Sequence, residues 1–242
     1  MKIAAVIPSR FQSSRFPGKP LAQIAGKTMI ERVYRQVEKA ACFSEIIVAT
    51  DDRRILDEVI AFGGKAEMTD AAINSGTERV WSVLKKRNCA AVINVQGDEP
   101  LISEKLILQI YEALNKNIFD VVSAARFNRS YLDFCSKNVV KVVFDIGQQA
   151  LYFSRAPIPH CEKNLFEGFY QHIGIYGYTR QALESCMTGE VAPMEKTEKL
   201  EQLRFLHRQQ KIAIVLAEYE SQGVDIPADI AKVEAILREN HA

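Results

Sequence analysis

The sequence predicts an α/β protein with a mostly parallel sheet and a smaller lobe inserted in its second half. Short β-branched runs alternate with amphipathic stretches through the first half, as they do in βαβ units. This alternation weakens after Arg126 and returns near Glu195, which indicates the inserted lobe. The 242 residues are 48% hydrophobic and 25% charged, so the chain is long and apolar enough to bury a core without disulfides.

Charge and composition argue against several classes of protein. The 31 Lys and Arg residues nearly balance the 30 Asp and Glu residues, so no global field attracts nucleic acid or an anionic membrane. No apolar run approaches the roughly 20 residues that span a bilayer, and the run at 3–7 is too short for a signal peptide. The five cysteines never form a C-x-x-C pair, so neither a disulfide framework nor a zinc site is indicated. We therefore expect a cytoplasmic protein that neither enters the membrane nor binds nucleic acid.

Apolar spacing defines the elements of the first half. Residues 2–9 are nearly continuously apolar, which is typical of a strand buried on both faces. Ser75 and Glu78 fit a capping box, in which each residue satisfies a free amide at the start of a helix. The remaining elements, in chain order, are a helix over 29–37, a strand over 45–51, a helix over 55–60 that stops at Gly63-Gly64, a short strand over 65–69, a helix after the capping box, a strand over 90–98, a helix over 103–116 and a strand over 120–125.

The second half begins with strand-like segments separated by polar and proline-containing stretches. The β/α rhythm then returns and ends in a helix that starts near Pro227, a residue favoured in the first helical turn. The predicted elements are strands over 139–145, 150–154 and 170–178, a helix over 195–208, and a strand over 212–218.

These patterns divide the chain into three segments of one compact unit. We expect residues 1–125 to form the first α/β part, residues 126–190 the inserted lobe, and residues 191–242 the return to the α/β domain. No internal repeat or low-complexity linker separates them, so we expect the lobe to pack onto the main domain.

A basic loop follows the first predicted strand, at residues 9–20. Arg10 and Arg15 can make forked hydrogen bonds to phosphate, Lys19 can supply a point charge, and backbone amides near Gly18 can approach phosphate oxygens. The loop has neither the Rossmann glycine fingerprint nor a Walker A motif. A solvated basic loop is the competing interpretation, but its position after a buried strand favours a polyphosphate site.

Asp98 and Asp225 are candidate metal ligands. Asp98 ends a predicted central strand after a glycine, and Asp225 precedes a helix that starts at a proline. Two carboxylates suit Mg²⁺, which prefers oxygen ligands and is often shared with substrate phosphates. Taken alone, each aspartate is more typical of a turn or a helix cap than of a metal ligand. Periodicity does not bring the two together.

Two further groups are weak signals when taken alone. His172 and Tyr176 share one face of an alternating strand, where a histidine is more often a hydrogen-bonded core residue than a catalyst. Glu201 and Arg204 have the spacing of a surface pair on a helix, with leucines facing the core.

Taken together, the motifs resemble the 3-deoxy-manno-octulosonate cytidylyltransferase family nearly from end to end. The basic loop is shared with other sugar nucleotidyltransferases, whereas the blocks A-L-Y-F-S-R-A-P-I-P, H-I-G-I-Y and L-E-Q-L-R are more specific to the family. The segments that carry the resemblance are 7–10, 13–21, 49–52, 75–79, 94–101, 138–141, 150–159, 172–176, 200–204 and 223–225.

The resemblance implies an activity and a fold. Members of the family activate the acid sugar 3-deoxy-manno-octulosonate, KDO, by joining its anomeric oxygen to the CMP moiety of CTP, with release of pyrophosphate, for lipopolysaccharide biosynthesis. It implies a Rossmann-like nucleotidyltransferase domain, a homodimer, and a role for the lobe in sugar binding and dimerisation.

The resemblance also implies residue roles. Lys19, Asp98 and Asp225 match catalytic positions, and the two aspartates match the Mg²⁺ ligands. The residues that match the CTP site are Pro8, Arg10, Ser13, Arg15, Lys19, Ser75, Gly76, Arg79 and Gln96. The residues that match the acid-sugar site are Arg155, His172, Tyr176, Glu201 and Gln202.

Some positions depart from the common family pattern. Ser9 replaces a frequent alanine, Gln171 stands where a basic residue is often found, and Gln209-Gln210 replaces a common glycine. The substrate therefore stays open between KDO and a close relative such as its 8-amino derivative.

Two competing functions fit the sequence less well. A cytidylyltransferase for a sialic-acid-like sugar would share the nucleotide half, but the motif blocks of the second half disfavour it. A catalytically idle nucleotide-binding module is disfavoured because Lys19, Asp98 and Asp225 are all intact.

Overall fold

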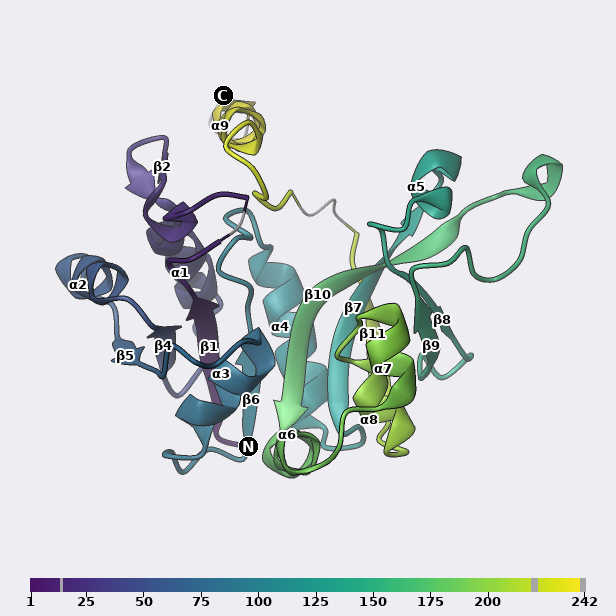
Figure 1. Ribbon diagram of the computed structural model, residues 1–242, viewed down its shortest axis with the longest axis horizontal. Helices are drawn as coiled ribbons and strands as arrows, with labels where there is room; N and C mark the ends of the chain where they lie inside the picture. Colours follow the sequence, from purple (N-terminus) through teal and green to yellow (C-terminus); the bar gives the residue numbers. More distant parts are fainter. Residues whose placement is uncertain (14, 219–221, 240–242) are drawn as a thin grey trace. The chain divides into compact units, whose positions relative to one another are not determined.

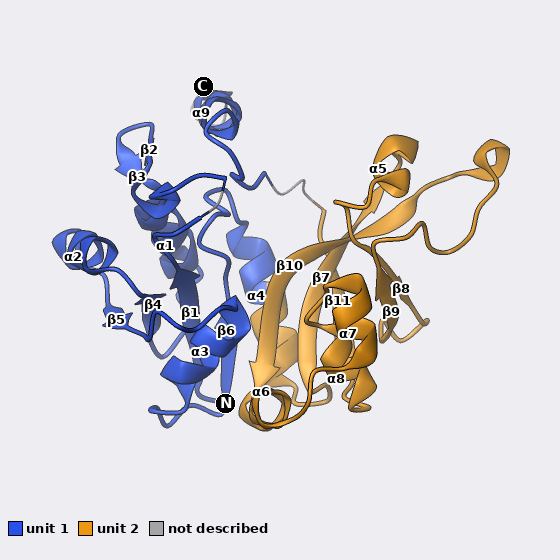
Figure 2. Cartoon of the chain, viewed as in Figure 1, with its two compact units in different colours: residues 1–108, 221–242 blue, residues 109–220 orange. Residues whose placement is uncertain are grey.

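The computed structural model describes residues 1–13, 15–218 and 222–239 (Figure 1). They form two compact units (Figure 2). Unit 1 holds residues 1–108 together with 221–242, and unit 2 holds residues 109–220.

Unit 1 is built on a parallel sheet. Its strands lie in the order β5 (Ala66–Met68), β4 (Ile46–Thr50), β1 (Ile3–Ser9) and β6 (Ala91–Asn94), and every neighbouring pair is parallel. The apolar stretch of β1 is buried on both faces, as its sequence predicts. The predicted α/β class with a mostly parallel sheet is confirmed.

Side-chain caps set the starts of the first three helices of unit 1. Thr28, Asp52 and Ser75 each accept a hydrogen bond from a free backbone amide in the first turn. A glycine with φ +84°, Gly63, follows the second helix, as the sequence predicts. The helical elements of this unit are α1 (Met29–Lys39), α2 (Arg53–Ala61), α3 (Gly76–Leu84), α9 (Asp229–Glu239), the 3₁₀ turn η1 (Lys19–Leu21) and the first part of α4 (Glu104–Asn115), within which the boundary to unit 2 falls.

A small apolar cluster fixes the C-terminal segment of unit 1. Val224 and Val233 pack with Ile24 and Met29, and all four side chains are buried. Ile24 lies in the hairpin of β2 (Gln23–Ile24) and β3 (Lys27–Thr28), which the sequence patterns did not predict. Burying these apolar side chains stabilises the contact between two segments about 200 residues apart in the sequence. The segment that carries Asp225 is held beside the first loop in this way.

Unit 2 combines parallel and antiparallel pairs. The longest strand, β10 (Phe169–Thr179), is antiparallel to β7 (Val121–Asn128) and β8 (Lys141–Phe144). The two outer strands are β11 (Ile212–Leu216), parallel to β7, and β9 (Ala150–Ser154), antiparallel to β8. The helical elements are α5 (Tyr131–Cys135), η2 (Lys163–Leu165), α6 (Arg180–Thr188), α7 (Pro193–Glu198), α8 (Leu203–His207) and the rest of α4.

The predicted helix over 195–208 is wrong. The segment forms two short helices, because Lys199 adopts a left-handed conformation with φ 54° that ends α7.

The compact units also divide the chain at positions other than the predicted 125 and 190. Strand β7 pairs with β10, and β11 pairs with β7, so both strands belong to the unit that contains the predicted lobe.

Candidate active site

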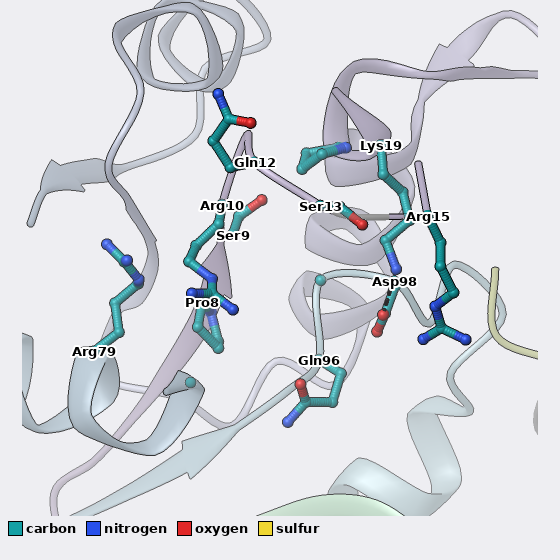
Figure 3. A pocket seen from close by; sticks show the side chains of 13 residues that line it. Pro8, Ser9, Arg10, Gln12, Ser13, Arg15, Lys19, Arg79, Gln96 and Asp98 are labelled. Atoms are coloured by element: carbon teal, nitrogen blue, oxygen red, sulfur yellow. Dashed lines mark hydrogen bonds and ion pairs between the residues drawn. The ribbon is translucent and has the colours of Figure 1, made fainter. Parts of the chain in front are cut away.

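A pocket of about 460 Å³ opens in unit 1 at the carboxyl ends of β1 and β6 (Figure 3). This is the edge of a parallel sheet at which ligands bind in open α/β folds. Of the residues predicted to bind nucleotide or metal, all except Ser75 and Asp225 line it. The lining residues are Pro8, Ser9, Arg10, Gln12, Ser13, Arg15, Lys19, Pro20, Gly76, Arg79, Gln96, Gly97 and Asp98.

The basic loop is held in a compact turn by its own backbone. The amide of Gly18 donates to the carbonyl of Phe11 at 2.9 Å, and Gly18 has φ +72°. A Cβ at Gly18 would lie 3.2 Å from the Phe11 ring, so both the conformation and the space favour glycine. The amide of Phe11 also donates to Asp51 at 3.3 Å, which ties the loop to the end of β4.

Lys19 lies between the two predicted metal-binding segments. Its ammonium donates to the Asp98 carboxylate at 2.6 Å (Figure 3). The same ammonium donates to the carbonyl of Val224 at 2.9 Å. The Lys19 side chain is 14% exposed, so it is a partly buried charge that its partners hold in place. The sequence predicts Lys19 and Asp98 for one site, and the structure brings them into contact.

Asp225 joins the same region through a second ion pair. Both terminal nitrogens of Arg15 donate hydrogen bonds to the Asp225 carboxylate, at 3.1 and 3.0 Å. The amide of Val224 donates to the carbonyl of Asp98 at 2.9 Å, so the backbone segments that carry the two aspartates are hydrogen-bonded to each other. A Cβ at Gly223 would lie 3.0 Å from a Glu99 carboxylate oxygen, so a side chain here would require the end of the Glu99 side chain to shift.

The donor set fits a hard divalent cation. Asp98 and Asp225 offer carboxylate oxygens in neighbouring segments beside a pocket rich in cations. Mg²⁺ is commonly held by one or two carboxylates, with the rest of its shell made of phosphate and water oxygens. No cluster of three or more His, Cys, Asp or Glu residues suited to a metal occurs among the described residues.

Arg79 is fully buried and held by several oxygens. Its guanidinium donates to the Asp51 carboxylate at 3.3 Å, to the carbonyl of Ile73 at 3.0 Å and to the Thr69 hydroxyl. Burial lowers the pKa of the guanidinium, and the Asp51 charge acts in the opposite direction. Arg79 therefore orders the segment before α3, in addition to lining the pocket.

Two glycines flank Pro8 on the cytidine side predicted from the sequence. A Cβ at Gly97 would lie 2.9 Å from the Pro8 carbonyl oxygen, and one at Gly76 would lie 3.5 Å from the Pro8 ring. Gln96 is half-buried and lines the same pocket. The Ser75 hydroxyl accepts from the Glu78 amide at 3.1 Å, so it serves as the cap of α3 and lies outside the pocket lining.

Two buried polar atoms of the pocket residues have no protein partner within the described part of the chain. They are the Ser9 hydroxyl, in a side chain that is almost fully buried, and the Nε of Arg79. Buried polar atoms are normally hydrogen-bonded, so these atoms suit a polar ligand. Sequence patterns did not select Ser9, Gln12, Pro20 or Gly97 as site residues, although all four belong to motifs that indicated the site.

The predicted sugar residues all lie in unit 2. Arg155 follows β9, and its guanidinium donates to the main-chain carbonyls of Glu198 at 2.9 Å, Lys137 at 3.0 Å and Lys199 at 3.4 Å. A guanidinium has five N–H groups, so these bonds to described residues leave two for a ligand. Arg155 therefore bridges three segments of unit 2.

His172 and Tyr176 are neighbours on β10, with ring centroids 5.4 Å apart. The Ser123 hydroxyl lies 2.9 Å from His172 Nε2 and 2.9 Å from the Ile175 carbonyl oxygen, so it joins the histidine ring to the backbone of the same strand. Burial lowers the pKa of His172 to about 3 and raises that of Tyr176 well above its ordinary value. Both rings are therefore neutral near pH 7.

Glu201 and Gln202 lie in the short segment that connects α7 to α8. Leu200 and Leu203 on either side are buried, as predicted. The guanidinium of Arg204 pairs with Glu195, not with Glu201 as the surface-pair interpretation has it. The left-handed residue that separates the two helices allows this arrangement.

Comparison with known proteins shows which family the chain is similar to. A family model described as Cytidylyltransferase matches residues 4–212. The 3-deoxy-manno-octulosonate cytidylyltransferase of Desulfosudis oleivorans is 45% identical and is matched over 98% of each chain. That of Syntrophotalea carbinolica is 43% identical over 98% of this chain and 99% of its own.

This chain belongs to the 3-deoxy-manno-octulosonate cytidylyltransferase family. A solved structure of CMP:2-keto-3-deoxy-manno-octonic acid synthetase complexed with CTP superposes with a TM-score of 0.94 at 37% identity, over 99% of this chain and 100% of that one. A thymidylyltransferase structure from Bacillus anthracis, at 12% identity and a TM-score of 0.71, shares the fold. The resemblance seen in the sequence motifs is therefore confirmed.

Family membership leaves the residue roles as predictions. The structure places the predicted nucleotide and metal residues in unit 1 and the predicted sugar residues in unit 2. Among the described residues no helix has the length and apolar character needed to cross a membrane.

Proposed function

We propose that this chain transfers CMP from CTP to the anomeric oxygen of KDO, giving CMP-KDO and pyrophosphate. The observation that carries the proposal is membership of the family over nearly the whole chain, with relatives at 41–45% identity and a CTP-complexed structural neighbour. The cation-lined pocket of unit 1 supports it from the residues themselves.

The basic loop is the triphosphate site in this proposal. Arg10, Arg15 and Lys19 stabilise the charge that builds on phosphoryl oxygens when the sugar oxygen attacks the α-phosphorus. The present partners of Lys19 and Arg15 are carboxylates, so nucleotide binding exchanges these ion pairs for phosphate contacts. Pro8, Gly76 and Gln96 surround the cytidine.

Asp98 and Asp225 hold Mg²⁺ in this proposal. The bound ion supplies Lewis-acid stabilisation of the phosphate charge. The aspartates position the loop as well, because each accepts a hydrogen bond from a cationic side chain of that loop. Their two roles are compatible, since phosphate replaces the carboxylates as the partner of those cations.

Unit 2 supplies the sugar site. The hydrogen bonds of Arg155 to described residues leave two of its N–H groups to pair with the sugar carboxylate. Neutral His172 and Tyr176 offer hydrogen bonds to hydroxyl groups without adding charge, and Glu201 and Gln202 complete the site. Tyr176 contributes a polar edge on an aromatic body, which suits a sugar face.

We further propose a cytoplasmic homodimer whose product serves lipopolysaccharide biosynthesis. Free thiols at all five cysteines suit a reducing compartment. Several exposed apolar side chains of unit 2, among them Phe127, Leu132, Leu151 and Leu165, suit an interface between two copies. Analytical ultracentrifugation tests the assembly, and a single species at the mass of one chain would refute the dimer.

A pyrophosphate-release assay with CTP tests the function. The sugar panel contains KDO, its 8-amino derivative and a sialic acid, with a reaction lacking sugar as the control. We expect release that depends on KDO and on Mg²⁺. Release that is fastest with another sugar would change the substrate, and no release with any of them would contradict the proposal.

A further inference from the structure

The carboxylate of Glu198, the last residue of α7, connects two segments that both carry predicted sugar residues. One oxygen accepts from the Ser154 hydroxyl at 2.6 Å, and the other accepts from the backbone amide of Arg155 at 2.9 Å. Hydrogen bonds to a charged acceptor are stronger than neutral ones, so this bridge fixes the end of β9 against α7.

The Ser154 hydroxyl extends the bridge by one residue. It donates its only hydrogen to Glu198 and accepts from the amide of Ala156 at 2.9 Å. The Ser154 side chain is almost fully buried, so water competes little for either bond. The Glu198 carboxylate therefore sets the backbone on both sides of Arg155.

The Arg155 side chain runs back to the same residue. Its Nε donates to the main-chain carbonyl of Glu198, and a terminal nitrogen donates to that of Lys199. Lys199 has φ 54°, and this left-handed turn is followed by Glu201 and Gln202. The orientation of Arg155 and the path of the chain into Glu201 are therefore coupled through Glu198.

Lys141 binds the main-chain carbonyl of Arg155. Its fully buried ammonium donates to the carbonyls of Arg155 at 2.6 Å, Ser136 at 2.8 Å and Val139 at 2.8 Å. The N–H and the C=O of Arg155 are thus bonded to side chains of opposite charge. A backbone held at both ends has little freedom to change its conformation when a ligand binds.

We propose that Glu198 is a positioning residue that fixes Arg155, and with it the turn into Glu201 and Gln202, for recognition of the acid sugar. The inference rests on the proposed function, because that function assigns these three residues to the sugar. Glu198 does not touch the substrate in this account. It acts through the two segments that it joins.

The test compares Glu198→Ala and Glu198→Gln in the full-length chain. The Gln side chain keeps one oxygen to accept from the Arg155 amide, and its amide can donate to the Ser154 oxygen. The Ser154 hydroxyl loses its acceptor in this variant, so Gln restores the bridge only in part. We expect Glu198→Ala to raise the KM for KDO roughly ten- to a hundredfold, the range for hydrogen bonds to charged groups. We expect Glu198→Gln to raise the KM less than Glu198→Ala does, and the affinity for CTP, measured by calorimetry, to be unchanged in both.

Two controls separate the possible outcomes. Glu184→Ala removes an exposed carboxylate from α6 of the same unit and should leave every parameter unchanged. Amide hydrogen exchange at Arg155 and Ala156 should accelerate in Glu198→Ala and much less in Glu198→Gln, which reports positioning without any sugar. An equal loss in both Glu198 variants, with unchanged exchange at these amides, would refute positioning, because the loss would then arise without any loosening of the backbone.

The remaining outcomes separate failure of the Glu198 proposal from failure of the proposed function. An unsubstituted chain that does not turn over KDO refutes the proposed function and the sugar role of Glu198 together. An active unsubstituted chain with an unchanged KM in Glu198→Ala refutes only the inference. A parallel loss of CTP affinity and melting temperature in Glu198→Ala, without rescue by Gln, would show a purely structural residue.

Discussion

Lys19 donates a hydrogen bond of 2.6 Å to Asp98. This contact joins a cation of the basic loop to a carboxylate 79 positions later in the chain, and it places the predicted phosphate and metal ligands side by side. The same ammonium contacts the carbonyl of Val224, the residue before Asp225. One lysine therefore organises three segments at the carboxyl edge of the unit 1 sheet.

Replacing either aspartate should abolish turnover and leave the fold intact. Asp98→Ala and Asp225→Ala each delete a proposed Mg²⁺ ligand whose side chain is at least one-third exposed. We expect kcat to fall at least about a hundredfold, as for loss of a group that stabilises developing charge. Turnover is measured beside a melting curve, with Asp57→Ala, an exposed carboxylate of α2, as the matched control. Near-normal turnover at saturating Mg²⁺ in either variant would refute the metal assignment.

The chain should discriminate against UTP. Cytosine and uracil exchange a hydrogen-bond donor for an acceptor, so a site built for one leaves buried groups unpaired with the other. If Gln96 and the turn at Gly76 read the base, kcat/KM with UTP should be lower by on the order of a hundredfold or more. Steady-state kinetics with both nucleotides test this, and equal use of the two would contradict it.

Ser9→Ala should weaken CTP binding. The Ser9 hydroxyl is buried beside the pocket and has no protein partner among the described residues, so a bound nucleotide is the partner that we expect for it. Loss of one neutral hydrogen bond should raise the Kd roughly two- to tenfold. Calorimetric titration measures the change, and Ser44→Ala, on the same unit but outside the pocket lining, is the control. An unchanged Kd for CTP in Ser9→Ala would show that water satisfies the hydroxyl.

Arg155→Ala should weaken use of the sugar far more than binding of CTP. Loss of a forked pair with the sugar carboxylate costs on the order of 1.5–3 kcal/mol, or roughly ten- to a hundredfold in KM. The structure adds a second effect. Three main-chain carbonyls lose a donor, so the melting temperature should fall too, and Arg155→Lys should recover only part of both losses. Weaker CTP binding with an unchanged KM for the sugar would contradict the assignment of Arg155 to the sugar.

His172 should stay neutral well below its ordinary range. Its pKa is lowered from 6.5 to about 3 by burial, so the folded protein does not take up this proton between these values, whereas the unfolded chain does. The contribution of His172 to stability is therefore complete above about pH 6.5 and declines as the pH falls towards 3. An NMR titration, with the resonance assigned from His172→Gln, should show no inflexion between about pH 8 and 5. An inflexion near pH 6.5 would contradict the buried, neutral ring.

Local sequence signals predicted the fold to the extent that local interactions determine it. The strand at Ile3–Ser9 and the helix capped by Ser75 depend on apolar periodicity and one side-chain cap, and both occur as predicted. The helix over 195–208 fails at Lys199, where the backbone adopts a left-handed conformation in a residue type that rarely does so. The contacts of Arg155 with Glu198 connect positions 43 apart in sequence, so periodicity does not reveal them.

The candidate site also combines a local motif with contacts between residues that are distant in the sequence. The basic loop is a local motif, and its residues line the pocket. Asp225 reaches this region because Val224 is buried in an apolar cluster with Ile24 and Met29, a tertiary contact that no spacing rule contains. The buried pair of Arg79 and Asp51 is equally non-local.

Phosphorus NMR of a reaction with CTP, KDO and Mg²⁺ tests the central claim most directly. The account predicts that the α-phosphorus of CTP becomes a phosphodiester while an equal amount of pyrophosphate appears, and that the same mixture with Asp98→Ala shows neither. Pyrophosphate accompanied by free CMP in a fresh reaction would indicate hydrolysis of the nucleotide. That result, or an unchanged CTP spectrum with the unsubstituted chain, would contradict the assignment of this protein as a CMP transferase acting on KDO.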